Sequence, residues 1–275
     1  MAIVAANVDE AVAGIADGST VLIGGFGTAG QPVELIDALI RSGAKDLTVV
    51  SNNAGNGRIG LAALFANGQI RKIICSFPRQ ADSYVFDELY RAGKVELELV
   101  PQGNLAERLR AAGSGIGAFF CPTGVGTPLT EGKEQRTIDG RDYVLEYPLK
   151  GDVALIKAFR ADTLGNLVYR KTARNFGPVM ATAAKITIVQ VSEILEPGEI
   201  DPEVVITPGI FVDRVVQVAG VAPPAEAEAA PEPEAAQPEP EPEAAEPEPE
   251  AAEPEAEAAS ESDTEADKEA TEDGA

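Results

Sequence analysis

The stretch Asp17-Gly18-Ser19-Thr20-Val21-Leu22-Ile23-Gly24-Gly25-Phe26-Gly27-Thr28-Ala29-Gly30-Gln31-Pro32 decides the fold class. Its branched apolar run at residues 21–23 predicts a buried strand. Four glycines fall between residues 24 and 30, and they allow the backbone to turn tightly and another molecule to approach closely. Pro32 then stands where the first turn of a helix tolerates proline. The stretch therefore predicts a strand, a glycine-rich loop and a helix in succession.

The same order of elements recurs along the chain. Short apolar runs that predict strands lie at residues 47–50, 73–76, 97–100, 153–158 and 186–191. Amphipathic segments that predict helices lie at residues 32–40, 59–66, 83–91, 104–112 and 175–185. Alternating strands and helices predict an α/β fold with an open, mostly parallel sheet covered by helices on both faces. Ligands bind such sheets beyond the carboxyl ends of the strands, so the turns after the strands are where function is expected.

The composition divides the chain near Val221. Residues 222–275 hold 20 of the 45 acidic residues but only one of the 22 basic ones, and they are almost wholly Ala, Glu and Pro. A segment without branched apolar or aromatic side chains cannot offset the entropy of ordering its backbone. We therefore expect a folded domain at residues 1–221 and a disordered acidic tail at residues 222–275. The alternative for the tail is a docking segment for a basic partner.

The residue types exclude whole classes of chemistry. The chain has no histidine, so it cannot build a Ser-His-Asp triad, a Cys-His pair or an HExxH zinc site. Its two cysteines, Cys75 and Cys121, are isolated from each other, which favours a reducing cytoplasm and small buried side chains over a metal site. No run approaches the roughly 20 apolar residues of a membrane span, and no secretory signal is apparent. We expect a cytoplasmic protein with no metal, no membrane and no nucleic acid among its ligands.

Taken only as a loop, residues 24–30 suit phosphate binding, a tight structural turn or a lid equally well. No Gly-Lys-Ser/Thr follows, so the loop is not a P-loop, and it is not the dinucleotide fingerprint either. Taken in full, residues 17–32 resemble the alpha-subunit signature of family I coenzyme A transferases: Asp-Gly, three apolar residues, Gly-Gly-Phe, three residues and Gly-x-Pro. Further blocks similar to that family follow in family order at residues 51–55, 101–108, 122–127, 165–167, 173–176 and 207–209. The resemblance covers residues 10–218.

The resemblance implies that this chain is an alpha subunit whose active site is shared with a similarly folded beta subunit. In this family the beta subunit carries a Glu-Asn-Gly motif whose glutamate attacks the acyl-CoA thioester and becomes a glutamyl-CoA thioester. This chain has no Glu-Asn-Gly, and its nearest equivalent, Gly55-Asn56-Gly57, lacks the carboxylate. The nucleophile is therefore expected on the partner. CoA and acyl-CoA are substrates in this chemistry, so no separate cofactor is expected.

Three polar residues match positions of the family's site. Gln102 matches the side chain that contributes to the oxyanion hole, where a neutral amide donor stabilises developing negative charge. The alternative is that Gln102 satisfies backbone groups in a turn. Asn52 and Asn53 match amides that contact the substrate carboxylate, although asparagine also favours tight turns.

The loop itself also matches the family. Its first four residues resemble a mobile loop over the active site, and they are Gly24, Gly25, Phe26 and Gly27. Phe26 could equally anchor the loop in the core.

The segments at residues 58–64 and 75–91 resemble the 3-oxoadipate branch of the family more than the acetoacetate branch. A dicarboxylate acceptor needs a partner for its second carboxylate, and an arginine fork can bind it bidentately. Arg79 or Arg58 is our candidate, although arginines are common on surfaces. The expected reaction is CoA transfer from succinyl-CoA to 3-oxoadipate. The alternatives are the alpha chain of a succinyl-CoA:acetoacetate transferase, a non-enzymatic sensor of acyl-CoA or sugar phosphate, and a scaffold that acts through the acidic tail.

Overall fold

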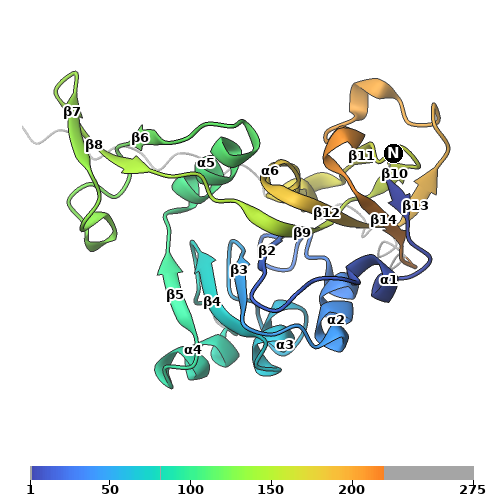
Figure 1. Cartoon of the computed structure of the whole chain (residues 1–275), viewed down its shortest axis with the longest axis horizontal. Coiled ribbons are helices and arrows are strands. Elements are labelled where there is room, and N and C mark those ends of the chain that lie inside the picture. The colour runs from blue at the N-terminus through green and yellow to red at the C-terminus, as the bar shows by residue number, and fades with distance from the viewer. Residues whose placement is uncertain (1, 81, 220–275) are drawn as a thin grey trace, which may run out of the picture. The chain divides into compact units, whose positions relative to one another are not determined.

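The computed structural model describes residues 2–80 and 82–219 (Figure 1). Its main feature is an eight-stranded sheet in which every neighbouring pair of strands is parallel. In spatial order the strands are β1 (Ile3–Val4), β14 (Arg214–Gln217), β12 (Ala184–Val191), β9 (Gly151–Lys157), β2 (Thr20–Ile23), β3 (Leu47–Val50), β4 (Ile70–Cys75) and β5 (Glu96–Leu99). The predicted α/β fold class is confirmed.

The order of the strands reverses next to β2. From β2 the chain builds β3, β4 and β5 on one side, and it later returns to place β9, β12 and β14 on the other side. The junction between β2 and β9 is therefore the topological switch point, which is where open α/β sheets leave a crevice for ligands. Since β2 ends at Ile23, the loop of residues 24–30, here called the glycine loop, begins at this point.

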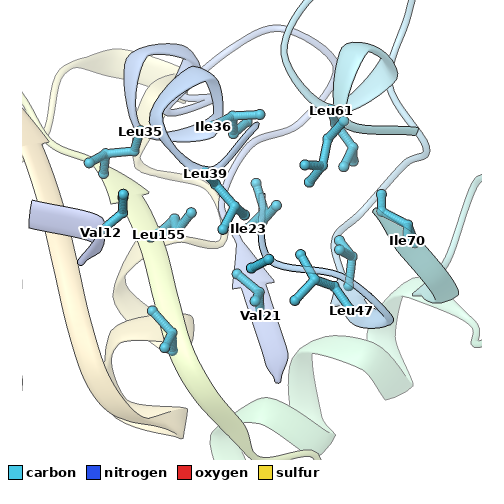
Figure 2. Packing of buried hydrophobic residues seen from close by; sticks show 14 of the residues in the cluster. Val12, Val21, Ile23, Leu35, Ile36, Leu39, Leu47, Leu61, Ile70 and Leu155 are labelled. Atoms are coloured by element: carbon cyan, nitrogen blue, oxygen red, sulfur yellow. The ribbon is translucent and has the colours of Figure 1, made fainter. Parts of the chain in front are cut away.

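Helices cover both faces of the sheet. On one face lie α1 (Val8–Val12), α2 (Val33–Ser42), α3 (Leu61–Ala66) and α4 (Tyr84–Arg91), and on the other lie α5 (Gln102–Gly113) and α6 (Gly177–Ala183). Side chains alternate between faces along a strand, so Val21 and Ile23 of β2 pack with the first group and Leu22 with the second. Figure 2 shows the first of these two cores, with Leu35, Ile36 and Leu39 of α2 facing the strands.

Two small three-stranded sheets were not predicted. One is antiparallel and consists of β6 (Phe119–Cys121), β8 (Arg141–Glu146) and β7 (Gln135–Ile138), and Figure 1 shows it beyond α5. The other consists of β11 (Leu167–Val168), β10 (Arg160–Asp162) and β13 (Glu193–Leu195). Short 3-10 helices complete the connections: η1 (Pro128–Thr130), η2 (Lys171–Arg174), η3 (Pro202–Val204) and η4 (Gly209–Phe211).

Several boundaries differ from those predicted. Helix α5 begins at Gln102, so this residue lies in the first turn of a helix and not in the turn before it. Helix α6 ends at Ala183 and β12 starts at the next residue, where the sequence predicted helix through residue 185. None of the helices formed by the described residues has the length and apolar character needed to cross a bilayer. The boundary predicted near Val221 and the predicted tail lie outside the described residues.

A ladder of alternating charges joins the main sheet to the β6–β8–β7 sheet. Lys72 of β4 contacts Glu98 of β5 at 2.6 Å, and Glu98 contacts Arg108 of α5 at 3.0 Å. Arg108 lies 3.9 Å from Glu146 of β8, which also pairs with Lys133 at 2.7 Å. Burial disfavours ionisation of Glu98, but the hydrogen bonds from Lys72 and Arg108 together outweigh it and lower its pKa. The ladder therefore links α5 to both sheets.

Glu146 is the buried member of this ladder, with a side chain only 3% exposed. Its Oε1 also accepts a hydrogen bond from Asn104 Nδ2 at 3.2 Å. We expect Glu146→Gln to lower the free energy of unfolding by about 1.5 kcal/mol, because it removes the charge from a buried hydrogen-bonded pair. The measurement is the denaturant midpoint followed by circular dichroism. Glu107→Gln, at an exposed pair with Arg110, is the matched control and should shift it very little. Equal midpoints for both variants would contradict the prediction.

Candidate functional site

The loops that follow neighbouring strands meet at the carboxyl edge of the sheet. The glycine loop follows β2, residues 51–60 follow β3, residues 76–83 follow β4, and α5 begins three residues after β5 ends. The carboxyl ends of parallel strands lie at one edge, so the polar residues predicted for the site are brought to the same side of the sheet.

Gln102 and Asn52 contact each other directly. Gln102 Nε2 donates a hydrogen bond to Asn52 Oδ1 at 3.0 Å, and Ser76 Oγ donates to the same oxygen at 2.7 Å. The backbone carbonyl of Asn52 accepts from the amides of Ser76 and Phe77 at 3.2 and 3.0 Å. Gln102, Asn52 and Ser76, here called the amide cluster, therefore link three successive loops of the sheet.

The amide cluster leaves Gln102 with donor capacity. A primary amide carries two N–H groups, and the contact with Asn52 uses one of them. No hydrogen bond joins this side chain to a backbone group within the described residues, so the geometry does not support the alternative of a turn-satisfying role. An oriented, neutral donor of this kind can stabilise an oxyanion without changing its own protonation state.

Asn53 is 1% exposed, and its two polar atoms behave differently. Its Oδ1 accepts from the backbone amide of Gly55 at 2.9 Å, which is the tight turn that asparagine favours. Its Nδ2 has no hydrogen-bond partner among the residues that the structure describes. A buried unpaired donor costs about 1–3 kcal/mol, so Nδ2 is unused hydrogen-bond capacity in the residue that follows Asn52.

The glycine loop has a defined turn. Phe26 and Ala29 exchange backbone hydrogen bonds at 3.0 and 3.1 Å, and the amide of Gly24 donates to Leu155 of β9 at 3.0 Å. Phe26 is 50% exposed, so it is not a core residue, and its aromatic ring is presented at the turn. The interpretation of Phe26 as a core anchor is therefore wrong.

Two of the amides at the start of α2 are already occupied by the protein itself. The amide of Val33 donates to the carbonyl of Gln31 at 3.0 Å, and that of Leu35 donates to Gln190 Oε1 at 3.1 Å. Because the protein itself occupies these two donors, this helix end offers an anion fewer amides than an uncapped one, which weakens the phosphate-binding interpretation of the loop.

Arg79 makes no hydrogen bond to the amide cluster among the described residues, and it lines a pocket of about 250 Å³. This pocket, here called the arginine pocket, is lined by Arg79, Gln80, Ser83, Tyr84, Asp87 and Arg91. Asp87 pairs with Arg79 at 2.6 Å and with Arg91 at 2.7 Å. Ser83 Oγ donates to the carbonyl of Gly55 at 2.9 Å, which joins the pocket to the turn made by Asn53.

Arg58 adjoins the arginine pocket through Tyr84. Its guanidinium carbon lies 5.8 Å from the centre of the Tyr84 ring. Arg58 makes no ion pair within the described ranges, whereas Arg79 is already paired with Asp87. Of the two predicted arginines, Arg58 therefore has the guanidinium with fewer competing carboxylates.

The described residues place no carboxylate in the amide cluster, and neither cysteine is an activated thiol there. Cys75 is fully buried, and burial raises the pKa of its thiol to about 12. Cys121 is only half-buried, contrary to the sequence interpretation, and its Sγ donates to Asn104 Oδ1 at 3.1 Å. Within residues 2–80 and 82–219 no group of His, Cys, Asp or Glu is gathered to hold a metal.

Large apolar side chains are exposed around this edge. Phe26, Ile59 and Phe77 are 50%, 63% and 57% exposed, and they belong to the loops after β2, β3 and β4. Exposed apolar groups that gather beside polar ligand-binding groups are typical of a surface covered by another molecule. The edge therefore combines oriented amide donors with an apolar rim.

The structure has a parallel sheet with its switch point at a glycine loop and with amide side chains at its carboxyl edge. A comparison with known protein families identifies the class of protein that has these features. The sequence profile named Coenzyme A transferase matches residues 5–218, and the chain belongs to that family. The resemblance found in the glycine loop and the later blocks is confirmed.

Two relatives within the family are each named as one subunit of an enzyme. The chain is 69% identical over 223 residues to a subunit of 3-oxoadipate CoA-transferase of Pseudomonas putida, which covers 81% of this chain and 96% of the relative. It is 53% identical over 207 residues to a subunit of a probable succinyl-CoA:3-ketoacid coenzyme A transferase of Bacillus subtilis, covering 75% of this chain and 86% of the relative. The crystal structure of glutaconate coenzyme A-transferase from Acidaminococcus fermentans has the same fold, with a TM-score of 0.70, 24% identity and coverage of 78% of this chain and 75% of that one.

The structure also assembles residues that the sequence did not single out. Ser76 completes the amide cluster, and its only sequence signal is its place as the last residue of the strand predicted at residues 73–76. Asn175 contacts the glycine loop from a distant part of the chain, with Oδ1 accepting from the Gly25 amide at 3.2 Å.

Proposed function

We propose that this chain is the alpha subunit of a heteromeric CoA-transferase that moves CoA from succinyl-CoA to 3-oxoadipate, with the catalytic glutamate on a beta subunit. One observation carries the proposal: Gln102 is held by Asn52 with a donor to spare, in a cluster that has amides and a hydroxyl but no carboxylate within the described residues. Such a half-site can stabilise an oxyanion but cannot generate one. It therefore requires a nucleophile from another chain.

In the first half-reaction the partner's glutamate carboxylate attacks the thioester carbonyl of succinyl-CoA. The oxyanion that develops accepts a hydrogen bond from Gln102 Nε2, and its collapse expels the CoA thiolate and leaves a succinyl-glutamyl anhydride. The thiolate then attacks the glutamyl carbonyl, releases succinate and forms a glutamyl-CoA thioester. The second half-reaction runs this sequence in reverse with the carboxylate of 3-oxoadipate, yields 3-oxoadipyl-CoA and restores the glutamate.

The other members of the edge are given roles that their positions support. Asn53 Nδ2 is the buried unpaired donor, and a substrate carboxylate is an acceptor that would satisfy it. Phe26, in the glycine loop with Gly24, Gly25 and Gly27, covers the acyl group and helps to exclude water. CoA and acyl-CoA are substrates in this scheme, so neither a metal nor a separate cofactor has a step to perform.

Two observations support 3-oxoadipate as the acceptor. The Pseudomonas putida relative is named for 3-oxoadipate and is more similar than the Bacillus subtilis relative, which is named for a 3-ketoacid. Arg58 and Arg79, beside the arginine pocket, can meet the second carboxylate that 3-oxoadipate has and acetoacetate lacks. Acetoacetate is the second candidate acceptor, favoured by the name of the Bacillus subtilis relative.

The partner is proposed to cover the carboxyl edge. The apolar rim of Phe26, Ile59 and Phe77 is suited to burial against another protein surface, and both relatives above are named as one subunit of a larger enzyme. A complex of this chain with a Glu-Asn-Gly-bearing beta subunit is placed in the cytoplasm, where CoA thioesters and free thiols persist together.

The experiment is CoA-transfer activity of the purified chain, alone and mixed with a beta subunit that carries Glu-Asn-Gly. Succinyl-CoA is the donor, and 3-oxoadipate or acetoacetate is the acceptor. We expect activity only in the mixture and a preference for 3-oxoadipate. A beta subunit whose motif glutamate is changed to glutamine is the matched control and should give no turnover.

Each other outcome has a definite meaning. Preference for acetoacetate would keep the enzyme class and change the acceptor. Turnover by this chain alone would place the nucleophile here and overturn the division of labour. No turnover in any mixture would refute the proposal and favour a non-enzymatic acyl-CoA-binding protein.

A further inference from the structure

Asn175 makes an unusually complete set of hydrogen bonds for a residue outside the amide cluster. It lies between η2 and α6, and its Oδ1 accepts from the amides of Gly25 at 3.2 Å and Phe176 at 2.7 Å. Its Nδ2 donates to the carbonyls of Ala29 at 2.9 Å and Thr172 at 2.8 Å. A primary amide has two donor hydrogens and an acceptor oxygen with two lone pairs, so Asn175 uses all of its capacity.

Two of these four bonds reach the glycine loop, and they reach both sides of its turn. Gly25 precedes and Ala29 closes the turn in which Phe26 and Ala29 pair. The other two bonds go to the backbone beside Asn175 itself and fix the orientation of its side chain. The side chain therefore ties the turn to a part of the chain about 150 positions away.

Gly30 of the glycine loop also packs closely against residues 173–175. A Cβ added at Gly30 would lie 2.5 Å from the carbonyl oxygen of Ala173 and 2.9 Å from Asn175 Nδ2. Gly30 has φ +73°, a conformation that residues with a side chain rarely adopt. The contact between the loop and residues 173–175 is thus a close backbone approach that only glycine at position 30 permits.

We propose that Asn175 is a positioning residue that holds the glycine loop in the shape needed for turnover, acting through Gly25 and Ala29. This inference rests on the proposed function and deepens it. Apart from its own turn, the described loop is tied to the sheet by the Gly24 bond to Leu155, so loss of the Asn175 bonds frees the exposed end that carries Phe26. Misplacement of a group at a reaction site by about 1 Å can slow turnover by about 100-fold.

Three variants separate this role from general stability. Asn175→Asp keeps the acceptor toward Gly25 and Phe176 but turns a second carboxylate oxygen toward two carbonyl oxygens, so the bonds to Ala29 and Thr172 are lost. Asn175→Ala removes all four bonds. Gly30→Ala changes the same contact from the side of the loop, because the added Cβ would push the loop away from Ala173 and Asn175. It tests whether the position of the loop controls turnover even if an Asn175 variant fails to fold.

Asn166→Ala is the matched control. Asn166 is also a loop asparagine whose side chain bonds to distant backbone, since its Oδ1 accepts from the Gly209 amide at 2.9 Å. Its Nδ2 donates to the side chain of nearby Asp162, at 2.8 Å from Oδ2. None of its hydrogen bonds in the described chain reaches the glycine loop. A loss of general stability would affect this control as much as the test variants.

The measurements are made on the assembled alpha–beta enzyme: amide hydrogen exchange of the peptide that covers residues 24–30, kcat, and KM for succinyl-CoA. We expect both Asn175 variants and Gly30→Ala to exchange faster in this peptide and to lose about 100-fold in kcat, with a smaller change in KM. Asn166→Ala should match the wild type in all three measurements.

Three results would overturn the inference. The first is unchanged exchange in the glycine loop of Asn175→Asp and Asn175→Ala. The second is faster exchange in that loop with wild-type kcat. The third is an equal loss of kcat in Asn166→Ala, which would make the effect one of stability. Failure of the proposed function is distinguishable, because it would appear as no CoA transfer by the wild-type mixture, while the exchange measurement would still decide whether Asn175 holds the loop.

Discussion

Replacement of Gln102 by alanine is expected to lower kcat of the assembled enzyme by about 100- to 1000-fold, which is the effect of removing one oriented donor to an oxyanion. Gln102 is at the exposed start of α5, and its side chain bonds only to Asn52 within the described structure. Alanine is well tolerated in a helix, so the fold should keep its stability. The KM for succinyl-CoA should change much less than kcat, because the oxyanion exists only in the transition state and the tetrahedral intermediate.

Two further variants sharpen this test. Gln102→Glu keeps the size of the side chain but places a negative charge where negative charge develops, so it should be at least as slow as alanine at neutral pH. Glu107→Gln lies on the same helix in an exposed ion pair with Arg110 and should retain full activity. Full turnover by Gln102→Ala with native assembly would remove Gln102 from the catalytic role.

The second large effect is on the choice of acceptor. Arg58→Ala combined with Arg79→Ala is expected to reduce the ratio of kcat/KM for 3-oxoadipate over acetoacetate by about 10- to 100-fold, since a hydrogen bond to a charged group contributes about 1.5–3 kcal/mol. Arg79 is paired with Asp87 and Arg58 has no acidic partner in the described chain. Arg58→Ala alone should therefore account for the larger share.

The control for the acceptor is Arg71→Ala, which removes an exposed arginine of β4 that pairs with Glu96 at 3.2 Å. It should leave the ratio unchanged. An unchanged ratio in the Arg58 and Arg79 double variant would refute the assignment of the second carboxylate to these arginines, while leaving the CoA-transfer chemistry itself intact.

The central strands of the sheet were predictable because they are buried on both faces. Apart from one threonine in each, β2 and β3 consist of apolar residues, and the turns after them are marked by Gly and Asn, so the sequence pattern indicates a strand followed by a turn. The β6–β8–β7 sheet lacks this signal. All four residues of β7 are exposed, so nothing in their hydrophobicity distinguishes a strand from a loop.

The residues of the site were predictable only where they belong to a local sequence motif. The glycine loop, Asn52, Asn53 and Gln102 stand in blocks that resemble the family, but their roles stay predictions. Ser76 is an isolated hydroxyl whose role depends on β4 lying beside β3. Asn175 stands in the block at residues 173–176 that resembles the family, yet its contact with Gly25 exists only once the two segments have come together in the fold.

The placement of β9 beside β2 affects the order in which the parts of the sheet can form during synthesis. The central pair of the sheet joins Val21 to Val153, and the Asn175 contact with the glycine loop comes later still in the chain. Contacts of such long sequence separation form slowly, because the intervening chain must first be ordered. During synthesis the first half of the chain therefore emerges with one side of β2 unpaired, a strand edge that invites association with other chains. This edge should close only after residues 151–175 have left the ribosome.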